Sequence, residues 1–192
     1  MKKILLSAIM AVAILAIAHN VYAQDQSLST TVTGTVASIF SLEFYTDANV
    51  LYSSTVPFTS VDPGDQYNYP DGRAEDDGKS DVGLLVTSNQ STPWYLKVGL
   101  TPGSELTSKL AYYMGQPYNR NWGTPSDGSI GHGDWFNIPS NIAPETMYTA
   151  GTADQLNTPF GTLATLSFKI DGAGLSPGGK TVSVTYTLTQ TP

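Results

Sequence analysis

Residues 94–100 read WYLKVGL, and this stretch decides the predicted fold. Apolar side chains occupy every second position from Trp94 to Leu100, and Tyr95, Lys97 and Gly99 lie between them. Successive side chains of a β-strand point to opposite faces of a sheet, whereas a helix repeats its face about every 3.6 residues. The spacing therefore predicts a strand with one buried face.

The same period of two recurs elsewhere, in residues 32–44, 164–170 and 182–188. Weaker strand signals lie near residues 50–52, 56–61, 82–88, 110–114, 135–138 and 147–149. Turn-forming sequences such as Asp62-Pro63-Gly64 separate these runs. Together they predict an all-β fold, a single antiparallel β-sandwich of immunoglobulin-like or Greek-key type with long loops. Residues 150–156 are compatible with one short helical turn.

The N-terminus has the pattern of an export signal. Lys2 and Lys3 precede an apolar run over residues 4–18, and Val21 and Ala23 place small residues at the positions before a cleavage site. The run is shorter than the roughly 20 residues that span a membrane. We therefore expect a bacterial signal peptide at residues 1–23 and an exported β-sandwich domain at residues 24–192, located at the cell surface, in the envelope or outside the cell. We expect no membrane insertion after cleavage.

The composition excludes several classes of partner and of catalytic chemistry. The chain of 192 residues has a net charge of −7, only 13% charged residues and no cysteine. A nucleic-acid binder needs a cationic face, so we expect no nucleic-acid partner. Without cysteine the chain has no disulfide, thiolate nucleophile or thiolate zinc site.

The sequence offers little for catalysis. His132 is the single histidine of residues 24–192, and it is flanked by glycines as expected for an exposed loop residue. There is no Gly-x-Ser-x-Gly elbow, so a catalytic triad is not expected. Paired carboxylates for glycoside hydrolysis remain an open alternative, because spacing in sequence does not set their separation. We expect a protein that is not an enzyme and that needs no cofactor, with calcium as one exception to test.

Calcium is suggested by the acidic residues 62–81. Calcium takes six to eight oxygen ligands, and carboxylates of one loop can converge on it. The alternative is a solvated acidic loop. The candidate ligands are Asp71, Asp76, Asp77 and Asp81.

Aromatic residues gather in residues 116–142, which are rich in glycine and asparagine, and Tyr112 and Tyr113 lie just before them. Exposed rings stack on the apolar faces of sugars. The alternative is that the rings cover one end of the sandwich, because an aromatic side chain buries a large area. The candidate glycan-binding residues are Tyr118, Trp122, Trp135 and Phe136.

Two alternating stretches carry a family resemblance. Trp94 and Leu96 form a Trp-x-Leu motif, and Tyr186 and Leu188 occupy the corresponding positions near the C-terminus, with tyrosine in place of tryptophan. This resembles bacterial surface proteins of the WxL-domain type. The resemblance implies noncovalent association with the cell wall, that is, with its polysaccharide or peptidoglycan. In outline the chain is also similar to secreted sandwiches of the spore-coat-U or pilin type.

Residues 27–36 also alternate. They can pair with the sheet edge of a neighbouring molecule, or form the first strand of their own sheet. We therefore expect a non-enzymatic structural or wall-association module of the envelope, with the cell wall or other envelope proteins as partners and with possible self-association. The alternatives are a carbohydrate-binding module and a pilin-like subunit that polymerises by strand exchange.

Overall fold

The computed structural model describes residues 38–75, 77–120, 124–139 and 143–192. Internal contacts divide the chain into residues 1–36 and 37–192, and every described residue lies in the second unit. The expected signal peptide and the alternating residues 27–36 lie outside the described residues. Within the described ranges, no helix has both the length and the apolar character needed to cross a bilayer.

The described residues form two sheets and two short helical segments. The larger sheet contains β1 (Phe40–Tyr45), β2 (Val50–Tyr52), β3 (Ser80–Ser88), β5 (Leu110–Met114), β6 (Tyr118–Asn119), β7 (Thr124–Pro125), β9 (Phe136–Asn137) and β11 (Thr162–Ile170). The smaller sheet contains β4 (Tyr95–Leu100), β8 (Ser129–Ile130), β10 (Glu145–Thr149) and β12 (Val184–Thr189). The helical segments are η1 (Pro70–Gly72) and α2 (Thr152–Gln155).

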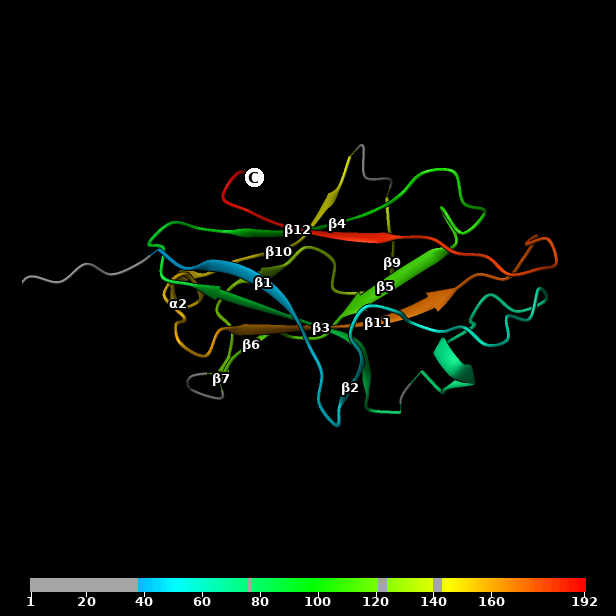
Figure 1. Cartoon of the computed structure of the whole chain (residues 1–192), viewed down its shortest axis with the longest axis horizontal. Helices are drawn as coiled ribbons and strands as arrows, with labels where there is room; N and C mark the ends of the chain where they lie inside the picture. The colour runs from blue at the N-terminus through cyan, green and yellow to red at the C-terminus, as the bar shows by residue number, and fades with distance from the viewer. Residues whose placement is uncertain (1–37, 76, 121–123, 140–142) are drawn as a thin grey trace, which may run out of the picture. The chain divides into compact units, whose positions relative to one another are not determined.

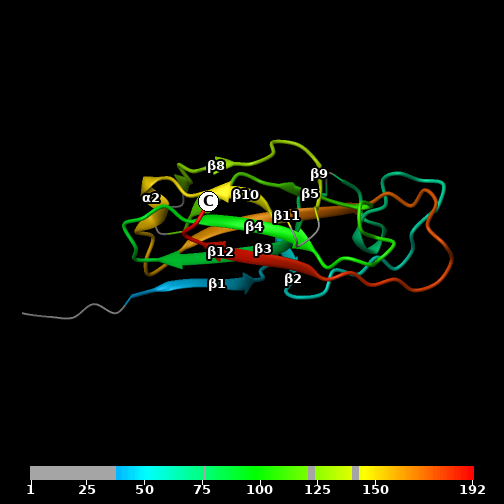
Figure 2. The same ribbon diagram turned by 90° about the horizontal axis from the view of Figure 1, so that it is seen from above.

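The two sheets pack face to face. Figure 1 shows β4 and β12 in one layer and β3 and β11 in the other. The order β1-β3-β11-β5-β9 runs across the larger sheet and β12-β4-β10-β8 across the smaller one, and Figure 2 shows the second order from above. All pairs are antiparallel except β2 with β3. The predicted all-β antiparallel sandwich is confirmed.

The alternating residues build the core. Trp94, Leu96, Val98 and Leu100 are at most 1% exposed, and they face the equally buried side chains of β3 and β11. Burial of one such side chain stabilises the fold by about 1.5–3 kcal/mol. The largest fully buried side chains are Trp94, Tyr112, Tyr148, Leu84, Leu96, Leu100, Met114 and Ile138.

Several strands that the sequence predicts are found at the predicted residues. Residues 50–52 form β2, residues 82–88 lie within β3, and residues 110–114 form β5. The expected helical turn is α2. Residues 56–61 were expected as a strand, and this is wrong, because they form a loop. Pro57 has no N–H to donate to a ladder there.

The long loops differ in character. Residues 62–81 carry η1 and reach the start of β3. The described parts of residues 116–142 are not structureless, since they contribute the two-residue strands β6, β7, β8 and β9. The strand predicted near residues 135–138 is confirmed as β9. The strands β6, β7 and β8 are too short to show a period in sequence and were not predicted.

Candidate functional site

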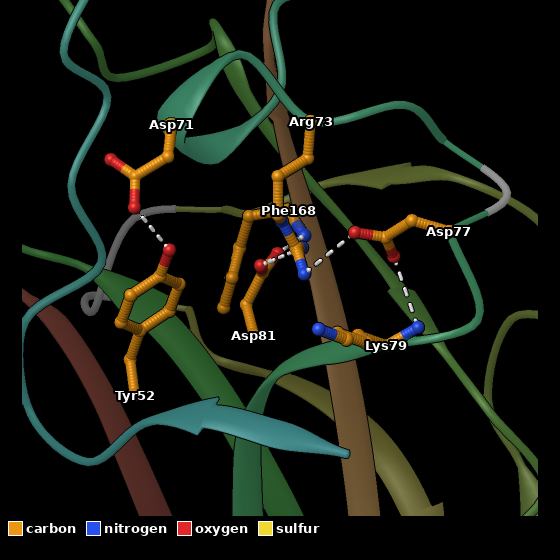
Figure 3. Close-up of polar contacts among 7 residues, drawn as sticks. All are labelled: Tyr52, Asp71, Arg73, Asp77, Lys79, Asp81 and Phe168. Atoms are coloured by element: carbon orange, nitrogen blue, oxygen red, sulfur yellow. Dashed lines mark hydrogen bonds and ion pairs between the residues drawn. The ribbon is translucent and has the colours of Figure 1, made fainter. Parts of the chain in front are cut away.

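Arg73 organises the acidic loop. Its Nη1 atom lies 3.2 Å from an oxygen of Asp77, and its Nη2 atom pairs with Oδ1 of Asp81 (Figure 3). The second oxygen of Asp81 accepts a hydrogen bond from the backbone N–H of Phe168 at 2.6 Å. A guanidinium group therefore ties the loop to the outer face of β3 and β11.

The candidate calcium ligands do not gather around a common position. Asp71 accepts a hydrogen bond from the Tyr52 hydroxyl at 2.5 Å, while Asp77 and Asp81 share Arg73 (Figure 3). Asp76 lies outside the described residues. In the described part of the chain, no three acidic or histidine side chains are close enough together to hold a metal ion. Among the described residues the calcium interpretation is therefore not supported, because Arg73 pairs with two of the four proposed carboxylates and the Tyr52 hydroxyl bonds to a third.

Asp81 makes stability depend on pH. Burial raises the pKa of its carboxyl group from 3.8 to about 6, and Arg73 opposes that effect only in part. Between about pH 4 and pH 6 the folded protein thus binds more protons than the unfolded chain. Asp81 therefore contributes stability below about pH 4 that is lost as the pH rises through about 6.

We expect Asp81→Asn to remove this component, which is at most about 3 kcal/mol for a shift of two pKa units. The asparagine oxygen can still accept the hydrogen bond from Phe168. Urea unfolding of both proteins across this pH range measures the difference. Parallel pH profiles for the two proteins would contradict the assignment.

An aromatic cluster lies on the outer face of the larger sheet. The ring of Trp135 is centred 5.9 Å from that of Tyr113 and 6.0 Å from that of Tyr69. The Lys169 ammonium group lies 4.3 Å from the centre of the Trp135 ring and 4.5 Å from that of Tyr67. The result is a group of four aromatic rings in which Lys169 lies against two, Trp135 and Tyr67.

The structure brings together only part of the expected glycan-binding set. Trp135 is half-buried within the cluster, whereas the adjacent Phe136 turns to the core, where its ring contacts Tyr112. Tyr118 is exposed, but it pairs with Leu163, six residues along β11 from Lys169. That separation is roughly 20 Å, so Tyr118 belongs to another part of the sheet. Trp122 lies outside the described residues.

The cluster also contains residues that the sequence did not single out. Glu75, Tyr69 and Lys169 come from the acidic loop and β11. The alternation in residues 164–170 does place Lys169 on the face opposite Phe168. Without the strand pairing, however, nothing in the sequence brings Lys169 beside Trp135.

His132 packs against Phe136 and Glu145. Its ring stacks on Phe136 at 3.5 Å, and its Nε2 atom lies 3.4 Å from Oε1 of Glu145. The expectation of an exposed loop residue is corrected, because the histidine is half-buried. Its contacts are those of a packed side chain.

The Trp-x-Leu residues are core residues. Trp94 and Leu96 are 1% and 0% exposed, so their side chains are not available to a cell-wall ligand. Tyr186 pairs with Val98 and Leu188 with Leu96, which joins the two parts of the motif across β12 and β4. Tyr186 and Leu188 are half-buried against the core. Trp94 and Leu96 can therefore affect wall association only through the fold that they support.

Asp154 forms a buried polar network beside Trp94. Its carboxylate accepts hydrogen bonds from the hydroxyls of Tyr148 at 2.6 Å, Thr162 at 3.0 Å and Ser126, and the Trp94 indole N–H donates to its backbone carbonyl at 3.2 Å. Asp154 is fully buried. A Cβ atom at Gly128 would lie 2.1 Å from the Tyr148 hydroxyl, so only glycine fits beside the network. No motif in the sequence indicates this network, because its residues come from separate segments of the chain.

A groove of about 1010 Å³ opens near the edge where β1 and β12 end the two sheets, and its lining comes mainly from the loops of residues 53–63 and 172–183. Its lining includes Phe44 from β1, Val184 and Tyr186 from β12, and Phe58 from the loop after β2. The rings of Phe44 and Tyr186 meet edge to face at 6.1 Å. The groove is lined largely by apolar side chains, although it is open to solvent.

Apolar side chains at β1 also remain exposed, and of these only Phe44 lines the groove. Ile39, Phe40 and Phe44 are all more than a third exposed. The alternation in residues 38–44 turns Phe40, Leu42 and Phe44 toward the core side of the sheet, because they pair with the inward-facing positions of β3. Since β1 is the terminal strand, this face is covered only in part by the smaller sheet.

Comparisons of the chain with protein-family models, with curated proteins and with solved structures found no match in any of the three. The resemblance to WxL-domain and to spore-coat-U or pilin-type proteins therefore stays a prediction, and function must be argued from the molecule itself.

Proposed function

We propose that the chain is an exported, non-enzymatic structural module of a bacterial cell envelope that works by associating with other molecules. The observation that best supports this is the apolar groove beside β1 and β12, together with the exposed rings of Phe40 and Phe44. Contiguous exposed apolar surface of this kind marks interaction sites in soluble proteins. Terminal strands of a sheet are also common places for added strands.

The occupant that fits this groove is an extended segment of a second copy, residues 27–36. Their alternation would turn Leu28, Val32 and Val36 to one face, which matches an apolar groove. As a strand, ten residues span about 33 Å, so the segment is long enough to extend along all six residues of β12. Strand exchange of this kind would join copies into a chain, because each copy both donates a segment and accepts one.

We expect the exported chain to self-associate as its concentration rises, and Phe44→Asp to weaken that association by about tenfold or more, because a charge would enter the apolar groove. Sedimentation velocity over a concentration series measures both effects.

The matched control is Phe160→Asp, because Phe160 and Phe44 are each 50% exposed and only Phe44 lines the groove. Phe160→Asp should associate like the unaltered chain. Deletion of residues 27–36 should abolish association without lowering thermal stability. An unaltered chain that stays monomeric at all concentrations would refute the proposal, and so would a deletion that destabilises a monomer, since residues 27–36 would then belong to their own sheet.

A further inference from the structure

The outer face of the larger sheet carries a second, separate cavity. It is a pocket of about 390 Å³ lined by Glu75, Lys79, Tyr113, Asp134, Trp135 and Ser167. It shares no lining residue with the groove beside β1 and β12. The proposed association through the groove does not use this pocket.

Strand pairing places the floor of the pocket. Tyr113 of β5 pairs directly with Ser167 of β11, so the two side chains lie next to each other on the outer face. Lys169 is two residues further along β11 and therefore on the same face. Trp135 stands just before β9, which pairs with β5. The wall opposite comes from the acidic loop, through Glu75 and Lys79.

The aromatic rings are held in place before any ligand arrives. The Trp135 indole N–H donates a hydrogen bond to Glu75 at 2.7 Å, and the Tyr69 hydroxyl donates to the same carboxylate. These two bonds hold the pKa of Glu75 below its usual value, so the carboxylate stays ionised at neutral pH. Lys169 rests against the Trp135 ring. A ligand that binds here pays little entropy for ordering the indole.

Charges of both signs surround the pocket. Glu75 and Asp134 bring two negative charges and Lys79 one positive charge to its lining. Lys169 lies against the Trp135 ring without lining the pocket, and its positive charge balances the remaining negative one. A phosphate or other anion would meet two carboxylates, and a ligand cation would compete with Lys169 for the Trp135 ring. A purely apolar ligand would desolvate three charged groups without replacing their hydrogen bonds.

We propose that this pocket binds a neutral carbohydrate, with one pyranose ring against Tyr113 and Trp135. The apolar C–H face of a pyranose matches an aromatic ring, and its hydroxyls both donate and accept hydrogen bonds. Asp134 accepts from those hydroxyls, Lys79 donates to them, and Ser167 can do either. A neutral sugar can use aromatic rings together with hydrogen-bond donors and acceptors, whereas an ion cannot use all three.

The test is binding of the exported chain to cellohexaose, xylohexaose and chitohexaose, measured by isothermal titration calorimetry, and to purified peptidoglycan sacculi, measured by co-sedimentation. We expect binding to at least one of these probes. Tyr113→Ala and Trp135→Ala should each weaken it by roughly tenfold or more, because aromatic contacts dominate such sites. Binding to sacculi together with chitohexaose points to wall glycan, and binding to cellohexaose or xylohexaose alone points to a free polysaccharide.

The matched control is Tyr118→Ala, since Tyr118 and Tyr113 are 37% and 40% exposed on the same sheet but only Tyr113 lines the pocket. Tyr118→Ala and Phe44→Asp should bind sugar like the unaltered chain, so that failure of the groove proposal and of this one can be told apart. Binding to none of the four probes would overturn the inference. So would binding that Tyr113→Ala and Trp135→Ala leave unchanged in variants with unaltered thermal stability.

Discussion

Replacement of Trp94 by alanine is expected to lower the free energy of unfolding by about 3–5 kcal/mol, the usual cost of removing a large buried aromatic side chain. The indole is 1% exposed, its ring is centred 5.6 Å from that of Tyr148, and its N–H donates to the backbone carbonyl of Asp154. The variant therefore loses core packing and one buried hydrogen bond. Chemical denaturation followed by circular dichroism measures the change.

Two further variants make this prediction specific. Trp94→Phe keeps most of the ring but removes the N–H, so it should cost less than alanine does. Trp135→Ala removes a half-buried tryptophan from the outer face of the sheet, and should cost clearly less than Trp94→Ala. If Trp94→Ala keeps its full stability and loses only binding to peptidoglycan, Trp94 contacts the wall ligand directly, and the prediction that it acts as a buried core residue is contradicted.

The second large effect is expected at Asp154. Asp154→Ala leaves the hydroxyls of Ser126, Tyr148 and Thr162 without their shared acceptor inside the core. Each buried polar group that loses its partner costs about 1–3 kcal/mol, so three give roughly 3–9 kcal/mol. We expect the lower end of that range, because the Ser126 and Tyr148 hydroxyls also bond to each other and Asn157 donates to Thr162. The backbone N–H of Gly151 also donates to this carboxylate, at 3.2 Å, and the start of α2 should loosen with it.

Thermal and urea unfolding of Asp154→Ala measure this loss, and Glu43→Ala is the control, because it removes an exposed carboxylate from β1. Glu43→Ala should change stability by less than about 0.5 kcal/mol. Equal stability of Asp154→Ala and the unaltered chain would show that the three hydroxyls find other partners, and that the network does not stabilise the fold.

The fold class was predictable because its signal is local. A period of two in residues 94–100 and 164–170 specifies a buried face wherever the strand lies, and both stretches are buried as expected. The same pattern in residues 38–44 predicted the correct facing of Phe44 but not its exposure. Whether a face is covered depends on the neighbour above it, and β1 ends its sheet.

The candidate sites were less predictable for a related reason. The aspartates of residues 71–81 suggested a shared cation, yet Arg73 from the same loop takes that place. Trp135 and Phe136 looked equivalent in sequence, but Trp135 precedes β9 and lines the outer pocket, whereas Phe136 begins β9 and packs against the core.

By itself the sequence determined the long strands that build the core, the apolar side of each of them, and that the chain lacks thiol chemistry. Only the tertiary structure decided which residues meet. Three contacts join segments that are far apart in the chain. They are the pairs Trp94 and Asp154, Lys169 and Trp135, and Phe44 and Tyr186. The physical reason is that alternation specifies the face of a strand, whereas pairing and register depend on how all strands together bury their apolar faces.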